Sequence, residues 1–183
     1  FALSITSILT YLAAFLLYIL IGWYFWRNTW NQSSPDTSDR VLVTVTWAHY
    51  AMLAPLVLHA ITLYQSMFVG MGLSFGVGNA ISSIVWLTAF IYWFSGFFNR
   101  LRGLQTLVAP IAAAAAIATL LPLVFPSLRP LENTDLPAFK AHLLVAMMAY
   151  SLLTIAALHA LLMTVEERHL HRPATHSILT NLP

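Results

Sequence analysis

The chain has 183 residues, of which 60% are hydrophobic and only 8% are charged, and its mean hydropathy is +0.79. A soluble domain carries about 25% charged residues, so this composition excludes a soluble globule and places the chain in a bilayer. The absence of cysteine excludes disulfides, thiolate metal sites and covalent haem attachment through a C-x-x-C-H motif. The net charge of +2 is too small to indicate a nucleic-acid partner.

Five apolar segments are long enough to cross a membrane as helices, which requires about 20 residues each. They cover approximately residues 1–26, 41–64, 79–98, 104–125 and 139–165. The sequence therefore predicts an all-α fold, a polytopic membrane helix bundle in which residues 1–183 form a single membrane domain of five transmembrane helices.

Glycine, proline and alanine predict where the helices turn, bend and pack. The linker after the second segment is uncharged and contains Gly70, Gly72, Gly76 and Gly78. It forms either a compact turn or a segment that dips back into the membrane interface. In the second segment, Pro55 frees the carbonyl of Ala51, so we expect a kink there. The Ala112–Ala116 run in the fourth segment favours close helix packing.

The basic residues are distributed unequally between the two ends of the predicted helices. Six of them fall on one side, namely Arg27, Arg40, Arg100, Arg102, Arg168 and Arg172. Arg129 and Lys140 fall on the other side. By the positive-inside rule, the side with six arginines is cytoplasmic and the N-terminus is outside.

Two histidines inside these segments are candidate ligands. His59 lies five residues before Tyr64 and His142 lies three residues after Phe139, which places them about 7 Å and 5 Å below the outer edge. An ionisable side chain within a span is a functional candidate by default, because its burial in lipid is costly. Two imidazoles at one depth are what haem iron or another metal centre needs, so His142 and His59 are the predicted cofactor-binding and metal-binding residues. In the alternative, each hydrogen-bonds to a neighbouring carbonyl.

Other polar residues predict less chemistry. His49 and His159 lie nearer the inner side, where bonding to a carbonyl is the expected role. Three further histidines, His169, His171 and His176, follow the last segment and are expected in solvent. The hydroxyl groups of Ser82, Ser83 and Thr154 are expected to bond to nearby carbonyls. The predicted spans contain no carboxylate and no catalytic motif, so we assign no catalytic residues.

One stretch resembles a known family. Residues 141–152, AHLLVAMMAYSL, place a histidine at the outer start of a helix and a tyrosine about two turns later. This stretch resembles the histidine-to-tyrosine helix of the cytochrome c assembly protein family, which includes CcsA and ResC. The run 153–171 and the LHAI sequence at 58–61 are most similar to the YpjD-like inner-membrane branch. The Trp-rich haem-presenting signature of CcsA proteins is absent here, as it is from that branch.

The resemblance implies an assembly factor, rather than an enzyme, that binds or passes haem b at its outer side. It implies His142 as the haem ligand and His59 as its candidate partner. The expected location is a bacterial inner (plasma) membrane, with lipid, haem and other cytochrome assembly or membrane-complex subunits as partners. We also expect the intact polypeptide to be longer, with further membrane helices. Two other functions stay open: a structural or accessory subunit of a membrane complex without haem, and a small-molecule transporter.

Overall fold

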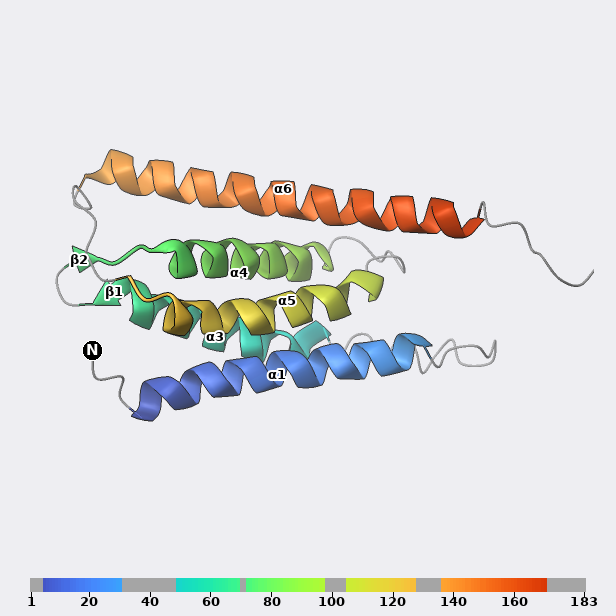
Figure 1. Ribbon diagram of the computed structural model, residues 1–183, viewed down its shortest axis with the longest axis horizontal. Coiled ribbons are helices and arrows are strands. Elements are labelled where there is room, and N and C mark those ends of the chain that lie inside the picture. Colours follow the sequence, from blue (N-terminus) through green and yellow to red (C-terminus); the bar gives the residue numbers. More distant parts are fainter. Residues whose placement is uncertain (1–4, 31–48, 70–71, 98–104, 128–135, 171–183) are drawn as a thin grey trace, which may run out of the picture.

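The computed structural model describes residues 5–30, 49–69, 72–97, 105–127 and 136–170. Over these residues the chain is helical apart from one short hairpin and a few turn residues, which confirms the predicted all-α class. The helices are α1 (Ile5–Trp30), α3 (Leu53–Met67), α4 (Val77–Ser95), α5 (Gln105–Val124) and α6 (Pro137–Leu170) (Figure 1). The strands β1 (Phe68–Val69) and β2 (Gly72–Leu73) pair antiparallel between α3 and α4.

Four helices form a bundle, and α6 flanks it. α1 packs on α5 and α3, and α4 packs on the same two helices, so the four close around a common core. α6 packs along α4 on the outside of this bundle (Figure 1). α1, α4 and α6 run away from the end where the hairpin lies, and α3 and α5 return toward it. The hairpin therefore marks one end of the bundle, the end at which α3 finishes and α6 begins.

Three helices have the length and composition of membrane spans. They are α1 over Ile5–Arg27, α4 over Val77–Ser95 and α6 over Pro137–Leu161. The apolar stretch of α5, Val108–Val124, is shorter, and the 15 residues of α3 rise about 22 Å. The described residues thus contain three candidate spans of a membrane protein. The count of five stays a prediction, and residues 41–48 of the second predicted segment lie outside the described part.

The second predicted segment is interrupted near Pro55. Residues 49–51 are helical, Met52 is a turn residue, and α3 begins at Leu53. Proline has no amide hydrogen for the carbonyl four residues earlier, which weakens the helix at this point. Beside the interruption, the indole N–H of Trp93 in α4 donates to the carbonyl of His49 at 2.8 Å. A side chain from a neighbouring helix thereby satisfies a backbone group at the break.

In its described part, which leaves out residues 70 and 71, the Gly-rich linker contains the antiparallel pair of β1 and β2. The amide of Ser74 donates to the carbonyl of Met67 at 2.7 Å and closes the turn. The side chain of Asn79 in α4 then holds the turn on the bundle. Its Oδ1 accepts from the hydroxyl of Ser66 at 2.8 Å, and its Nδ2 donates to the carbonyl of Ser74 at 2.9 Å. One buried amide side chain therefore ties α3, the hairpin and α4 together.

α4 and α5 approach each other closely at the hairpin end. A Cβ atom placed on Gly78 would lie 2.7 Å from the carbonyl oxygen of Leu121 and 2.8 Å from that of Phe125. Those distances are too short for any side chain, so glycine is required for the two backbones to meet. Further along α5 the fully buried alanines are Ala112, Ala115 and Ala116. Their burial in the core confirms the predicted packing role of the alanine run.

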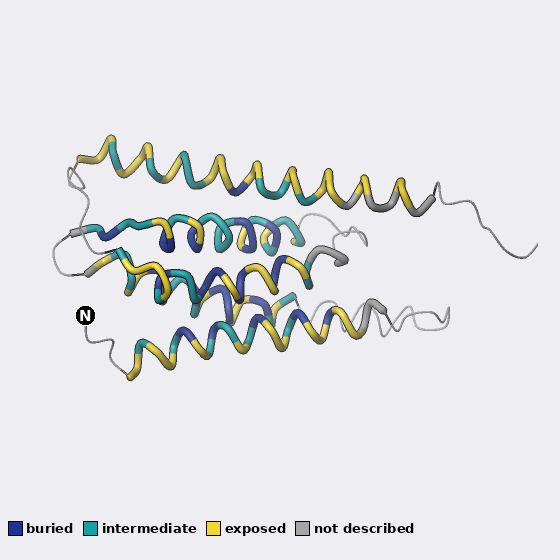
Figure 2. The backbone as a smooth tube through the Cα atoms, in the orientation of Figure 1, coloured by how far each residue is buried: buried dark blue, intermediate teal, exposed yellow. Residues whose placement is uncertain are grey.

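α6 makes a much smaller contact with the rest of the molecule. Among its described side chains Ser151 is the one that is buried, and most others are exposed (Figure 2). The hydroxyl of Ser151 donates to the carbonyl of Ile84 in α4 at 3.1 Å and also lies 2.7 Å from the carbonyl of Met147 in its own helix. The small side chain allows α6 to lie close to α4, and the bond across the interface fixes the contact.

Candidate functional site

His59 lies in α3 inside the bundle and has no exposed surface (0%). Its Nε2 atom and the hydroxyl oxygen of Ser82 in α4 form a hydrogen bond of 2.9 Å. Its ring lies edge-on to the ring of Tyr18 in α1, with 5.8 Å between the ring centroids. Side chains from three helices therefore meet at this imidazole, and a large ligand reaches it only if those helices separate.

The backbone around His59 is held by two further hydroxyl groups. The hydroxyl of Thr62 donates to the carbonyl of His59 at 2.8 Å, a bond within α3. The phenol of Tyr11 in α1 donates to the carbonyl of Thr62 at 3.2 Å. The second bond joins α1 to α3 about one turn from the imidazole. The position of His59 is thus fixed through its side chain by α4 and through its backbone by α1.

His142 has the opposite environment. It lies near the start of α6, and its side chain is exposed. His142 and Ser151 are nine residues apart, which is two and a half turns of helix, so they lie on opposite faces of α6 at about 180°. Since Ser151 bonds to α4, the imidazole of His142 lies on the face turned away from the bundle. Among the described residues it makes no hydrogen bond, so both of its ring nitrogens are available to a ligand from that side.

The structure does not bring His142 and His59 together. α3 and α6 both pack on α4, but His59 is enclosed by the bundle and His142 is exposed. His142 lies in the second turn of α6, which begins at the hairpin end, whereas His59 lies at the middle of α3. A haem can approach the exposed His142 without any change in the bundle. It cannot contact His59 in this arrangement, because the imidazole is fully buried and its Nε2 is already bonded to Ser82.

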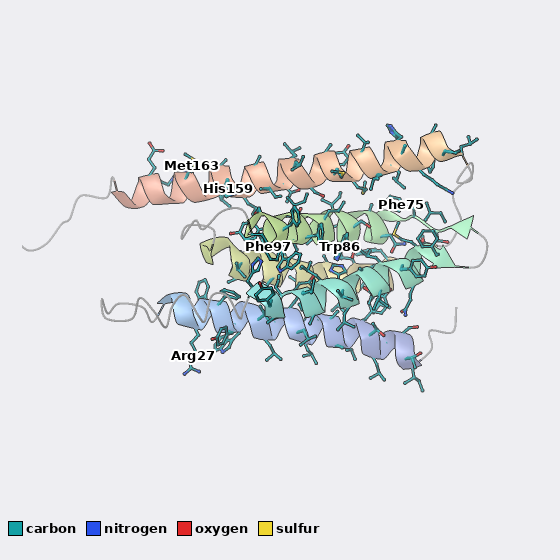
Figure 3. The ribbon with its side chains drawn as sticks, turned by 180° about the vertical axis from the view of Figure 1, so that it is seen from behind. Arg27, Phe75, Trp86, Phe97, His159 and Met163 are labelled. Atoms are coloured by element: carbon teal, nitrogen blue, oxygen red, sulfur yellow. The ribbon has the colours of Figure 1, made fainter. Side chains whose placement is uncertain are left out.

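His49 occupies an aromatic pocket at the other end of the bundle. Its ring stacks on Trp93 at 5.5 Å between centroids and lies edge-on to Phe97 at 4.6 Å. Gly96 makes the stack possible, because a Cβ atom there would lie 2.6 Å from the His49 ring. Phe97, which lies two residues after the end of α4, is labelled in Figure 3. These contacts are those of a packed aromatic side chain. The expected bond from the imidazole to a carbonyl does not occur among the described residues.

The remaining histidines belong to α6 or follow it. His159 is exposed on α6 (Figure 3). His169 lies in the last turn of α6, where its side chain is outside the described part, as are His171 and His176 altogether. Within the described residues no group of three or more histidine, cysteine, aspartate or glutamate side chains could hold a metal ion. A metal centre built from protein side chains alone is therefore not present in that part, whereas a haem, which brings four nitrogen ligands, needs only one or two imidazoles.

Sequence reasoning did not assign the partners of His59. Ser82 was expected to bond to a nearby carbonyl, but its hydroxyl pairs with the imidazole of His59. The hydroxyl of Thr154 does bond within its helix, to the carbonyl of Tyr150 at 2.8 Å, as expected. The one sequence signal for the contact between Ser82 and His59 is that a serine within one span lies at a depth similar to that of a histidine in the neighbouring span. That signal does not specify which helix faces meet.

Comparison with known proteins identifies no relative: no family model, no curated protein and no solved structure matches the chain.

Proposed function

We propose that this chain is an integral membrane protein that binds or passes haem b in support of cytochrome c assembly, with His142 as its axial ligand. The observation that carries the proposal is the position of His142, an unpaired imidazole at one end of an apolar helix, on the face turned away from the bundle. An ionisable side chain at such a position is costly in lipid unless it serves a ligand or a partner. The resemblance of residues 141–152 to a haem-handling helix supports the choice of haem.

The residues near His142 suit a flat, apolar ligand. Ala146 and Ala149 lie one and two turns further along the same face of α6, so their methyl groups leave the approach to the imidazole open. Haem supplies the redox and ligand chemistry of its iron when it is bound. This chain would supply one neutral imidazole nitrogen, an apolar helix surface against the porphyrin ring, and an orientation toward the hairpin end of the molecule.

In this proposal His59 is a structural residue of the bundle and does not bind haem. A haem bound by both histidines would require the His59 ring to leave Ser82 and to move out of the bundle past α4. We therefore assign the ligand role to His142 and place His59 in the interior network that holds α1, α3 and α4 together.

The proposal includes an orientation in a bacterial inner (plasma) membrane. With the N-terminus outside, the hairpin end and His142 face the outer side, and the cluster of six arginines faces the cytoplasm. A reporter that is active only in the cytoplasm, fused after Arg102, should be active. Activity of a reporter that works only outside the cytoplasm, fused at the same position, would overturn this orientation.

An accessory subunit of a membrane complex is the second candidate. The observation that favours it is the exposed surface of α6, including Leu153 at 65% and Met163 at 71%, which packs on no described helix (Figure 3). A neighbouring subunit could cover that face without any cofactor. The presence or absence of haem separates the two candidates.

The deciding experiment is a pyridine haemochrome spectrum of the protein purified from membranes of cells supplied with haem. We expect the absorption bands of non-covalent haem b, extractable into acidified acetone, because the chain has no cysteine for covalent attachment. A preparation that is folded by circular dichroism but has no haem bands would contradict the proposal and favour the accessory subunit.

A further inference from the structure

Nearly all the buried hydroxyl and amide side chains of the bundle have hydrogen-bond partners in the described structure. They include Thr62, Asn79, Ser82, Thr88, Thr119 and Ser151. Several of them bond to a carbonyl about one turn back in their own helix, which needs no other element. The interior thus follows the general rule that buried polar groups are paired.

Four buried polar atoms among the described residues depart from that rule, namely the hydroxyls of Tyr18 and Tyr92, Nε2 of His49 and Nδ1 of His59. Two of these atoms belong to neighbouring side chains. His59 and Tyr18 are both fully buried (0% exposed), yet Nδ1 of His59 and the hydroxyl of Tyr18 have no hydrogen-bond partner among the described residues. Their rings touch edge to face at 84° between the ring planes. A buried polar atom without a partner is unfavourable, and in native proteins such atoms mark an ordered water or a bound ion.

In this structure no described side chain hydrogen-bonds to either of these two atoms. The core cluster around Tyr18 contains four alanines from α4 and α5, whose side chains carry no polar atom, namely Ala89, Ala112, Ala115 and Ala116. The hydroxyl of Ser82 is already used on the other ring nitrogen of His59. The cluster also contains Tyr92, whose hydroxyl is likewise unpaired and makes no bond to either atom in this structure. A bound species would supply the missing partner.

The chemistry of the two atoms selects water over a cation. Nδ1 of a neutral imidazole donates or accepts according to its tautomer, and a phenol does both, so a water molecule fits either state. The sequences of α1, α3, α4 and α5 contain no aspartate or glutamate, so a buried cation would have no opposite charge beside it. We infer that the bundle binds an ordered water between His59 and Tyr18, and that this water joins Ser82, His59 and Tyr18 into one hydrogen-bonded chain across three helices.

The water itself can be detected by hydroxyl-radical labelling of the intact protein in detergent, with the radicals generated by a synchrotron pulse in ¹⁸O-water. A water fixed against Tyr18 generates the radical in place, so Tyr18 should be labelled well above Phe25. Phe25 is the matched control because it lies on the same helix and is also buried, at 9% exposed. Labelling of Tyr18 no greater than that of Phe25 overturns the inference.

The Tyr18→Phe substitution gives an independent test, because its effect has opposite signs in the two cases. If the hydroxyl binds a water that also bonds to His59, its removal breaks the chain and the melting temperature falls. If the hydroxyl is dry and unpaired, its removal relieves an unfavourable burial and the melting temperature rises. Tyr24→Phe, at an exposed tyrosine of the same helix, should leave the melting temperature unchanged. A higher melting temperature for Tyr18→Phe overturns the inference. Neither test depends on haem, so both remain decisive whatever binds at His142.

Discussion

The Nε2 atom of His59 and the hydroxyl oxygen of Ser82 lie 2.9 Å apart, and this bond joins α3 to α4 in the interior of the bundle. The residues are 23 positions apart in the sequence and are connected through the hairpin, so the contact depends on how the two helices face each other. Among the histidines whose side chains the structure describes, His59 alone has no exposed surface, and this bond is part of its environment.

Replacing Ser82 with alanine should destabilise the protein. The substitution leaves the imidazole nitrogen buried without a partner, which costs about 1–3 kcal/mol in free energy of unfolding. Thermal unfolding in detergent, followed by tryptophan fluorescence, measures the loss. Ser95→Ala is the matched control, because the hydroxyl of Ser95 bonds only to the carbonyl of Tyr92 in its own helix. Equal melting temperatures for Ser82→Ala and Ser95→Ala would show that the contact between the helices contributes nothing.

A methyl group on Gly78 should separate α4 from α5. Its Cβ would lie 2.7 Å from the carbonyl oxygen of Leu121, and neither backbone can move aside without disturbing the hairpin end. We expect Gly78→Ala to lower stability by about 1–3 kcal/mol, as is usual for overpacking, although alanine is the better helix former. Gly22→Ala is the control. There the new Cβ would lie 3.3 Å from the methyl group of Ala112, a tight contact that small shifts relieve. A Gly78→Ala protein as stable as the wild type would show that the two helices do not approach this closely.

The contact between α6 and α4 can be tested with engineered cysteines, because the chain has none of its own. The hydroxyl of Thr88 lies 3.5 Å from the carbonyl oxygen of Ser151, so the pair Thr88→Cys and Ser151→Cys should form a disulfide on mild oxidation. The control pair is Thr88→Cys with Ala149→Cys, because Ala149 is exposed on α6. The disulfide is detected by trypsin digestion and mass spectrometry. Equal crosslinking of both pairs would mean that α6 does not present the Ser151 face to α4.

Much of the fold followed from the sequence because apolar length and small residues act locally. Four of the predicted segments correspond to α1, α4, α5 and α6, and the weakness expected at Pro55 appears as the interruption at Met52. Ala112, Ala115 and Ala116 of the α5 alanine run lie in the core, and Ala113 and Ala114 are exposed. These features depend on residues within one helix, so they can be recognised without knowledge of the neighbouring helices.

The site was less predictable because it depends on which helix faces meet. Counting 1.5 Å per residue from the outer edge placed His59 and His142 at one depth, which made them a plausible ligand pair. Depth says nothing about rotation, and the rotation of the helices separates them. The hydrophobic pattern of α6 is nearly uniform around its axis, so it does not indicate that Ser151 faces α4 and that His142 faces away.

The most direct measurement is the Soret absorption of the purified protein and its histidine variants after expression with haem supply. His142→Ala should abolish the Soret band or shift it strongly, because the imidazole on the open face of α6 is then missing. His159→Ala should retain the wild-type band, because that residue is an exposed histidine on the same helix without the proposed role. His59→Ala should also retain haem, with lower thermal stability. A Soret band of wild-type position and intensity in His142→Ala would contradict haem ligation by His142.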